Sequence, residues 1–478
     1  MAETLQQLVA SADSTVDLLR NVDLEFNQYV FPPEYTNWIE EQRAVRESVG
    51  LVDQSYHMEP CYVRGPDAVP FLESLAINSF EKIRAREPPQ AINLCMCNPD
   101  GYIIGDQILF HLDENEFSSV GSVWANNWIR YNAEVLDYDV TAETPYGPYM
   151  DEATPPKYRF QIQGPHALDV MEAVVDGSLP DIPFFAMDVL EMGGQVTGGQ
   201  ETGGQETGGQ ETGDQELRSH QAHALGHGMA AMPGLEIFGP YEYHDEVRDA
   251  ILAAGQEYDI RQVGSKAYKT GKIGSGWLVG PVPAIYEHEG LREYREWLDP
   301  DGTEARFSIG GSFVAEDITD YYMMPMERGQ GHLVSFDHDF VGRAALEAAM
   351  DEPRRERVTF VWNPEDVVDV YASLFQDGET KKFVDLPDTA NTWSKSHYDR
   401  VEKDGELVGL SKYPGYLYYE RDMLSLGLID PEYSDPGTKV TFVWGDDSTK
   451  RRVERHEPTT IRATVAEAPY VTGGRESM

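Results

Sequence analysis

The segment AVRESVGLVDQSYHMEPCYVRGPDAVPFLESL, residues 44–75, contains the order of elements that decides the fold. A polar, Arg-rich stretch over residues 38–49 predicts a helix. The pattern over residues 60–64 predicts a strand, and Gly65-Pro66-Asp67 predicts a turn before an amphipathic helix over residues 68–75. Helix and strand signals therefore alternate within this one segment.

Later segments repeat and extend this pattern. Two apolar runs within residues 91–110 flank Asn98-Pro99-Asp100-Gly101, where Pro presets φ and Gly supplies a positive φ, so they predict a β-hairpin. Residues 159–163, followed by Gly164-Pro165-His166, predict the same strand-turn-helix unit again. Beyond about residue 355 short apolar strands predict a small β-barrel. Its strands are expected at residues 358–362, 407–409, 424–429, 439–444 and 459–465.

The segment GGQVTGGQETGGQETGGQETGDQE, residues 193–216, is a five-residue repeat of Gly, Gln, Glu and Thr. Such a composition cannot bury apolar surface, so we expect a solvated loop. Because regular patterns resume on both sides, we interpret the segment as an insertion in a β-hairpin within one domain.

The chain of 478 residues is strongly acidic, with 83 Asp and Glu against 38 Lys and Arg and a formal net charge of -45. Nucleic acid and anionic membrane surfaces would repel it, so neither is expected as a partner. The excess of negative charge is spread along the chain, and repulsion among these charges destabilises the folded state unless salt screens them. We therefore interpret it as adaptation to a high-salt cytoplasm, in preference to an acidic surface that binds a partner.

The N-terminal sequence and the cysteines both favour an intracellular setting. MAETLQQLVASADSTVDLL has neither the basic region nor the apolar core of a signal peptide, and no run of ~18 apolar residues occurs, so we expect a cytoplasmic protein. Cys61, Cys95 and Cys97 are too few for a disulfide framework. Cys95 and Cys97 should share one side of a strand, as core residues rather than zinc ligands.

Two further patterns are rejected as binding motifs. The glycines of GSKAYKTGK, residues 264–272, are too far apart for a phosphate loop, and Ile273 replaces the required Ser or Thr. His220, His223 and His227 adjoin the repeat and lack a nearby carboxylate pattern, so we interpret them as loop residues rather than metal ligands. We expect no metal site.

Several segments in a fixed order resemble the glycine-cleavage T-protein (aminomethyltransferase) superfamily. Residues 44–75 resemble the family's G-L-x-D-x-S-x-H-M turn, strand and GPDA, and NPDGYIIGDQILF at residues 98–110 resembles a family hairpin that carries two aspartates. Further matches are FQIQGPHALDVM, GLEIFGP, FDHDFVGRAALEA and ATVAEAPY. The resemblance implies an α+β fold. It consists of a folate-binding region of two interleaved subdomains over residues 1–354, with mixed or antiparallel sheets, and a β-barrel domain over residues 355–478.

Within the superfamily the chain is most similar to the tetrahydrofolate-dependent O-demethylases of vanillate and syringate. The shared segments include TVDLLRN, PEYTNW, DQSYHM, HGMAAMPGLEIFGPYE and VGSKAY, then PAIY, YREWL, IGGSFV and DITDYY. The resemblance implies a transferase that moves a methyl group from a small-molecule, methoxylated donor to tetrahydrofolate. Cleaving a methyl ether requires a nucleophile for the methyl carbon and a proton donor for the departing oxygen.

The resemblance also implies roles for individual residues. Glu236 should hold the pterin, since a carboxylate can accept two N–H donors from its guanidine-like edge. Asp106 should lie near the reacting nitrogens, with Gly105 in place of the first aspartate of the family's pair. Tyr268 matches a tyrosine that contacts the substrate oxygen in the demethylases; the alternative is an ordinary half-buried aromatic residue. His57 matches their active-site histidine; the alternative is an ordinary core or turn histidine.

Two expected substrate-pocket residues depart from the demethylase pattern. Phe31 stands where those enzymes have a tyrosine, and a phenyl ring cannot transfer a proton. Ser122 stands where they have an arginine that binds the substrate carboxylate, so the obvious partner of a benzoate is missing. We therefore expect a neutral methoxylated aromatic, or another uncharged methyl donor, to be preferred.

Two other functions stay open. The first is a true aminomethyltransferase of glycine cleavage, although Lys266-Ala267-Tyr268 replaces the arginine-aspartate pair of T-proteins. The second is a folate-binding protein without transferase chemistry, which the retention of Asp106, His57 and Tyr268 disfavours.

We predict that the melting temperature rises between ~0.2 and ~2 M KCl, because screening relieves repulsion among the carboxylates. Thermal unfolding followed by circular dichroism over this range tests the high-salt interpretation. A flat or falling melting temperature contradicts it.

Overall fold

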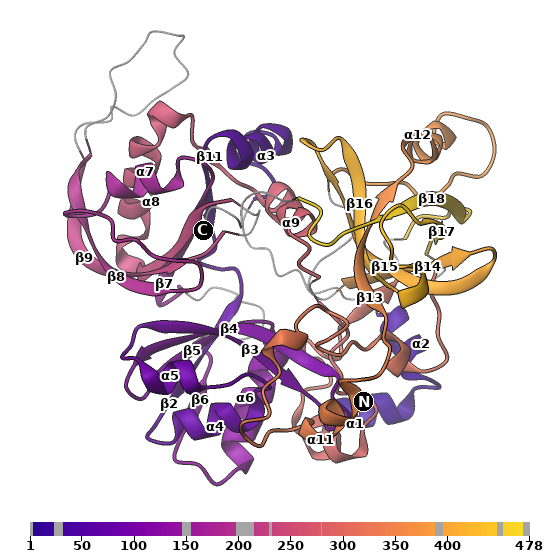
Figure 1. Ribbon diagram of the computed structural model, residues 1–478, viewed down its shortest axis with the longest axis horizontal. Helices are drawn as coiled ribbons and strands as arrows, with labels where there is room; N and C mark the ends of the chain where they lie inside the picture. The colour runs from indigo at the N-terminus through magenta and orange to yellow at the C-terminus, as the bar shows by residue number, and fades with distance from the viewer. Residues whose placement is uncertain are drawn as a thin grey trace.

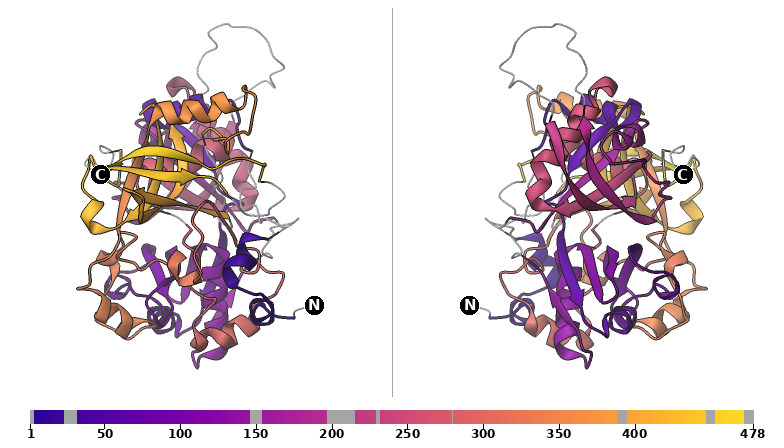
Figure 2. Two further views of the ribbon diagram at one scale, coloured as in Figure 1. Left: turned by 90° about the vertical axis from the view of Figure 1, so that its right-hand side faces the viewer. Right: turned by 90° about the vertical axis from the view of Figure 1, so that its left-hand side faces the viewer.

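Three β-sheets form the frame of the computed structural model, which describes residues 3–22, 32–145, 154–196, 215–228, 232–278, 280–387, 395–446 and 453–471. The sheets are arranged around a common centre (Figure 1). In the side views of Figure 2 the first sheet and the barrel both lie above the second sheet. Mixed and antiparallel sheets with helices and a closed C-terminal barrel confirm the predicted α+β class.

The first sheet is mixed, because β1 pairs in parallel with β11 and every other neighbouring pair is antiparallel. Helices α7 (Ala167–Glu172) and α8 (His244–Ala254) pack on it. Its strands, in spatial order, are β11 (Arg261–Gln262), β1 (Gly50–Asp53), β7 (Lys157–Gln163), β10 (Gly234–Pro240), β9 (Gln215–Gly226) and β8 (Met187–Val196).

The second sheet is antiparallel, and helices α4 (Ala68–Leu75) and α6 (Val123–Val135) pack against it. The hairpin predicted around Asn98-Pro99-Asp100-Gly101 is confirmed as β3 and β4. The strands, in spatial order, are β3 (Gln90–Cys97), β4 (Ile103–Asp113), β5 (Glu116–Gly121), β2 (Glu59–Arg64) and β6 (Thr141–Glu143). Helix α5 (Glu81–Ala85) directly precedes β3.

The two sheets repeat one unit. In each, a strand leads through a Gly-Pro turn to a helix, a three-strand meander follows, and its third strand returns beside the first. Gly65 and Gly164 make the equivalent turns at φ values of 140° and 132°. A Cβ at Gly65 would lie 2.2 Å from Asp139 O, and one at Gly164 would lie 2.4 Å from Ser48 O, so both turns require glycine.

The C-terminal strands close into a six-stranded barrel, because β14 pairs with both β15 and β17. The five predicted barrel strands are confirmed, while β14 and helix α12 (Pro364–Ser373) were not predicted. The division at residues 354 and 355 stays a prediction. Around the barrel the strands are β14 (Lys395–Lys403), β15 (Glu406–Leu417), β16 (Asp422–Ile429), β13 (Glu356–Trp362), β18 (Thr459–Ala466) and β17 (Lys439–Trp444), with β12 (Ser308–Gly310) beside β14.

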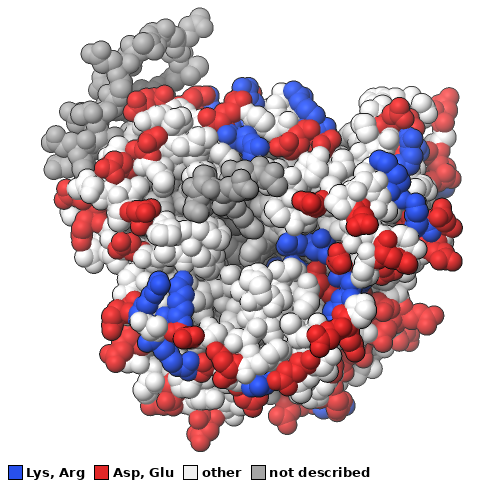
Figure 3. Space-filling view, viewed as in Figure 1, with Lys and Arg blue, Asp and Glu red and all other residues white. Residues whose placement is uncertain are grey.

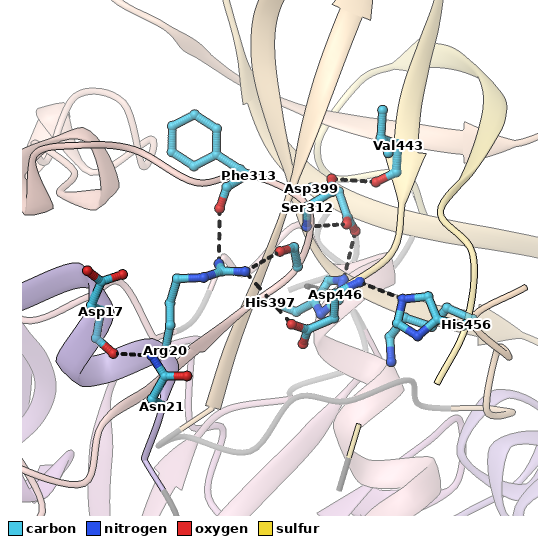
Figure 4. Close-up of polar contacts among 12 residues, drawn as sticks. Asp17, Arg20, Asn21, Ser312, Phe313, His397, Asp399, Val443, Asp446 and His456 are labelled. Carbon is cyan, nitrogen blue, oxygen red and sulfur yellow. Dashed lines mark hydrogen bonds and ion pairs between the residues drawn. The ribbon is translucent and has the colours of Figure 1, made fainter. Parts of the chain in front are cut away.

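Buried polar contacts join the N-terminal helices to the barrel (Figure 4). Arg20 of α2 (Thr15–Arg20) donates to the carbonyl oxygens of Gly311 and Phe313 at 2.9 and 3.2 Å and lies 3.8 Å from Asp446. Beside it, His397 lies 2.9 Å from Asp399, whose carboxylate accepts from the Ser312 amide at 3.2 Å. The two ends of the chain are therefore held together by charge-assisted contacts.

The remaining helices pack at different places around the sheets and the barrel. Helix α3 packs on α9, and α9 in turn packs on β15. Asn37 caps α3 by accepting from the Glu40 amide, which explains where this predicted helix begins. These helices are α1 (Leu5–Ser11), α3 (Trp38–Glu47), α9 (Ser265–Gly274), α10 (Arg292–Trp297) and α11 (Arg343–Ala349).

The insertion enters at the end of a hairpin, as predicted. Strands β8 and β9 pair until Val196 and Gln215, so the first and last residues of the predicted segment 193–216 belong to strands rather than to a loop. Residues 197–214 lie outside the described part of the chain.

The three cysteines are core residues. Cys61, Cys95 and Cys97 are buried and free, and Cys95 and Cys97 belong to one apolar cluster, as predicted. Burial raises the pKa of Cys61 to about 12.

Within the described ranges no helix is long and apolar enough to cross a membrane.

Candidate active site

The site is built on one polar face of the first sheet. In β7, KYRFQIQ, apolar and polar residues alternate, so one face enters the core between the sheet and its helices. The opposite face carries Lys157, Arg159, Gln161 and Gln163. In β10, Glu236 pairs with Gln161 and therefore joins this face.

Glu236 is a buried carboxylate that contacts an arginine and a histidine. Its Oε1 lies 3.3 Å from Nε of Arg159, and its Oε2 lies 3.6 Å from Nδ1 of His227. Burial opposes ionisation of Glu236, but the His227 contact and the charge of Arg159 outweigh it, so its pKa lies below the usual value. Each carboxylate oxygen keeps further lone pairs with which to accept from a ligand.

A chain of amide contacts links Glu236 to Tyr268 of α9. The Gln161 amide lies 3.3 Å from Nδ1 of His227, and Gln54 Nε2 donates to Gln161 at 3.3 Å and to the Tyr268 hydroxyl at 2.9 Å. Burial raises the pKa of Tyr268 well above its ordinary value, and the charge of Glu236 adds to this shift. Tyr268 therefore holds its proton throughout the neutral range.

His57 and Lys272 contact the Tyr268 ring from two sides. The buried His57 ring meets it edge-on, with ring centres 5.4 Å apart and planes at 84°. The Lys272 ammonium lies 4.8 Å from the ring centre. A cation at this distance stabilises negative charge that develops on the ring.

Asp106 projects from β4 on the opposite wall. Its carboxylate lies 2.5 Å from Nη1 of Arg328 and accepts from Gln330 at 3.3 Å. Arg328 also donates to the Leu278 carbonyl at 2.6 Å, which fixes the guanidinium. Gly105, which replaces the other aspartate of the family's pair, has no room for a side chain, since its Cβ would lie 2.5 Å from Ala125 Cβ.

The structure brings three of the predicted residues into one cavity. Asp106, Glu236 and Tyr268 line it together, between the two sheets and α9. His57 lies behind Tyr268. The other lining residues are Gln54, Met58, Gln107, Ile108, Val120, Gly121, Phe185, His227, Lys272 and Trp277.

The two predicted substrate-pocket residues are placed differently. Ser122 is buried at the start of α6, its carbonyl accepts from Gln107 Nε2 at 2.9 Å, and its hydroxyl has no hydrogen-bond partner among the described residues. It does not line the cavity, although its neighbours Val120 and Gly121 do. Phe31 lies outside the described residues.

A second concavity, the basic mouth, opens from this cavity. It shares Phe185, His227 and Trp277 with the cavity and is also lined by Arg328 and Arg357, together with His332. No Asp or Glu is present among its described lining residues. Figure 3 shows Lys and Arg atoms near the middle of the visible face, while Asp and Glu cover much of its periphery.

The prediction that His220, His223 and His227 belong to a loop is wrong for His220 and His223. His220 and His223 lie in β9, where alternation and pairing with β8 and β10 continue past the repeat, and His227 follows directly. His220 lies 3.0 Å from the Tyr158 hydroxyl and stacks on Tyr243. Across the described ranges no three His, Cys, Asp or Glu side chains converge in a metal-binding group.

Comparison with known proteins identifies the family of the chain. Residues 20–198 match the GCVT N-terminal domain. The syringate O-demethylase of Sphingobium sp. (strain NBRC 103272 / SYK-6) is 37% identical over 98% of this chain and 96% of its own length. The chain belongs to the glycine-cleavage T-protein family. The predicted family and the predicted one-carbon transferase class are thereby confirmed.

Two further relatives are more distant. The sesamin methylene transferase of Sinomonas sp. (strain No.22) is 26% identical over 92% of this chain and 90% of its own length. The crystal structure of the glycine cleavage aminomethyltransferase T from Bartonella henselae matches with a TM-score of 0.57 and 17% identity, covering 92% of this chain and 91% of that one. This structural likeness shows the T-protein fold.

Sequence reasoning missed four residues that hold the site together. Arg159, Gln161, His227 and Arg328 fix the two carboxylates and the Tyr268 network. The alternation of KYRFQIQ was a usable signal, because it places Arg159 and Gln161 on one face. Arg328 carried no such signal, since its partner Asp106 is remote in the sequence.

We predict that Arg159→Met destabilises the protein by about 3–5 kcal/mol at pH 7, because it strands a buried carboxylate. Since the pKa of Glu236 is lowered in the folded state, this stabilisation is present above the unfolded pKa of about 4.3 and is lost as the pH falls. Denaturant unfolding at pH 7 and pH 3 tests this.

Arg159→Met/Glu236→Gln provides the control, because it removes the stranded charge and should recover part of the loss. An unchanged stability in Arg159→Met, or the same loss in the double variant, contradicts the prediction.

Proposed function

We propose that the protein transfers a methyl group from a methoxylated aromatic donor to tetrahydrofolate. The observation that carries this proposal is the convergence of Glu236, Asp106 and the protonated Tyr268 on one cavity. The similarity to a syringate O-demethylase over nearly the whole chain supports the same class of donor. The free, buried cysteines support a reducing cytoplasm as its setting.

The cavity has the chemistry that a reduced folate requires. The Glu236 carboxylate can accept N–H donors from the pterin edge, and Phe185 and Trp277 supply apolar surface for a flat ring. Arg357 and His332 in the basic mouth complement an anionic glutamate tail. When bound, tetrahydrofolate supplies the nitrogen that accepts the methyl group.

Tyr268 is suited to protonate the departing aryl oxygen. As the methyl–oxygen bond breaks, negative charge develops on that oxygen, and the Tyr268 O–H, which its raised pKa keeps protonated, can donate toward it. Gln54 holds the Tyr268 hydroxyl at 2.9 Å, and Lys272 stabilises the charge left on the ring. On the opposite wall, Arg328 holds the Asp106 carboxylate in place, so that this carboxylate can orient a bound ligand.

An aminomethyltransferase is the second candidate, supported by the fold it shares with the Bartonella enzyme. The replacement of the arginine-aspartate pair of T-proteins by Lys266-Ala267-Tyr268 weighs against this function. Lys266 forms an ion pair with Glu34 at 2.9 Å and does not line the cavity, so this position supplies no carboxylate for an amine.

The product distinguishes these functions. The full-length protein in high salt is incubated with tetrahydrofolate and either a methoxylated aromatic compound or an aminomethyl donor. Mass spectrometry should show 5-methyltetrahydrofolate with the first donor. Formation of 5,10-methylenetetrahydrofolate with the second assigns the aminomethyltransferase, and absence of both products supports binding without transfer.

We predict that Tyr268→Phe lowers the turnover number by ~10²–10⁴-fold, because it removes the proton donor. Tyr433→Phe, which removes a hydroxyl from a turn beside the barrel, should leave turnover unchanged. Initial rates of methyl transfer measure both. If Tyr268→Phe retains full activity, the proton comes from another group, with His57 the nearest candidate.

We predict that Glu236→Gln weakens tetrahydrofolate binding about tenfold or more, since it removes a charge-assisted contact worth ~1.5–3 kcal/mol. Titration calorimetry measures the dissociation constant. The exposed Glu242→Gln changes the net charge equally and should bind normally. Unchanged affinity in Glu236→Gln refutes this placement of the pterin.

A further inference from the structure

An ion pair on the helix-covered face of the first sheet lies behind the part of the chain that holds Tyr268. At the end of β1, Asp53 faces α8, while the next residue, Gln54, reaches the cavity and donates to the Tyr268 hydroxyl at 2.9 Å. His244, the first residue of α8, lies with Nε2 2.8 Å from Oδ2 of Asp53. The Asp53–His244 pair does not line the cavity, so it can act on the site only through the chain between them.

The Asp53 carboxylate also fixes the loop of residues 54–58 directly. Its second oxygen, Oδ1, accepts from the Ser55 amide at 2.9 Å, which closes a turn at the end of β1. Ser55 Oγ in turn accepts from the Arg159 amide at 3.1 Å, and the Gln54 amide donates to the Arg159 carbonyl at 2.8 Å. The loop is therefore held to β7 on one side and to the Asp53–His244 pair on the other.

The contacts of His244 require an imidazolium. Its Nε2 faces Asp53, and its Nδ1 lies 2.9 Å from Oδ1 of Asp245. Ionised carboxylates only accept hydrogen bonds, so both ring nitrogens carry a proton when both contacts are made. Burial opposes this protonation, but the two carboxylates outweigh it, so the pKa of His244 lies above its ordinary value.

The other charged and titratable side chains around His244 keep their charge near neutral pH or stay neutral there. Burial opposes ionisation of Asp53, but its contacts with His244 and Ser55 lower its pKa; the His244 contact lowers that of Asp245, and burial raises that of Tyr241. The complete set is Asp53 of β1, Asp245 and Arg248 of α8, Tyr241 of η1 (Tyr241–Tyr243), Tyr56 of the loop, and Tyr35, on whose pKa Asp53 acts.

The sign of the pH dependence follows from the direction of the shift. Because folding raises the pKa of His244, the stabilising contact is complete below the unfolded pKa of about 6.5 and is lost as the pH rises through the folded pKa. A neutral imidazole has one N–H, so one of its two carboxylate contacts loses its donor and the other loses its charge assistance. The loop is then held less firmly, and Gln54 with it.

We propose that His244 is a positioning residue, whose ion pair with Asp53 holds Gln54 against Tyr268, so that methyl transfer declines as His244 loses its proton. This inference rests on the proposed function and names a regulation of the same site by pH. Tyr268 itself does not cause the decline, because its raised pKa keeps it protonated over this range.

The pH profile of turnover tests the proposal. Formation of 5-methyltetrahydrofolate from tetrahydrofolate and 1,2-dimethoxybenzene, a donor with no ionisable group, is followed without oxygen at one fixed KCl concentration. Between about pH 6 and pH 9 the wild type should lose about tenfold in turnover number, as a charge-assisted contact is replaced by a neutral one. The Michaelis constant for tetrahydrofolate should stay constant, because Glu236 is not part of the pair.

Four variants accompany the wild type, and melting temperatures confirm that each is folded. Asp53→Asn keeps an oxygen for the Ser55 amide but removes the charge, so its turnover should be about tenfold lower at pH 6.5 and should not change up to pH 9. His244→Lys keeps the charge and should keep its turnover at pH 9, whereas His244→Gln should not. Asp169→Asn breaks an exposed pair with His166, 2.9 Å long, and should follow the wild type.

Hydrogen–deuterium exchange of the peptide that covers residues 53–58 gives a readout that does not depend on activity. Its protection factor in the wild type should exceed that in Asp53→Asn about tenfold at pH 6.5, and the two should converge by about pH 9. Equal protection at pH 6.5 overturns the inference.

The kinetic outcomes are equally decisive. A flat wild-type profile, wild-type turnover in Asp53→Asn at pH 6.5, or the wild-type decline retained in Asp53→Asn overturns the inference. Absence of methylated folate at every pH refutes the proposed function instead, and the exchange data then decide whether the Asp53–His244 pair holds the loop.

Discussion

The burial of the Glu236 carboxylate between the two sheets is the constraint on which the site depends. A carboxylate removed from water requires charged or hydrogen-bonding partners, and here they come from neighbouring strands, Arg159 on β7 and His227 after β9. His227 then engages Gln161, Gln161 engages Gln54, and Gln54 holds Tyr268. The position of the proton donor therefore follows from the way one buried charge is compensated.

The buried ion pairs of the site respond less to salt than the exposed charges of the surface do. The chain has a net charge of -45, yet cations such as Arg328 and Lys272 lie beside the cavity. Salt screens exposed charges strongly and buried pairs weakly. A high-salt solvent can thus relieve repulsion at the surface while the Arg328–Asp106 and Arg159–Glu236 pairs keep their strength.

Local patterns predicted most elements because they depend on neighbours in the sequence. The helix over residues 68–75, the hairpin around residues 98–101 and five barrel strands follow from periodicity and turn residues. Strand β14, with its polar sequence KSHYDRVEK, gave no apolar signal and was missed.

The site was predicted in part. Family motifs located Asp106, Glu236 and Tyr268, which one cavity unites. Motifs say nothing of which way a side chain turns, so Ser122 was expected in the pocket although it does not line the cavity. Pairs such as Asp106 with Arg328 arise from tertiary packing, and no local pattern encodes them.

The hairpin of β8 and β9 has a consequence for how the gene can change. Its pairing ends at Val196 and Gln215, and the exact copies of the five-residue repeat GGQET, residues 198–212, fall between these two positions in the sequence. Tandem repeats gain and lose copies when the template and the new DNA strand slip during replication. Because whole repeats preserve the reading frame, such events change the length of the insertion without shifting the register of the strands, and alleles that differ in repeat number can retain the same fold.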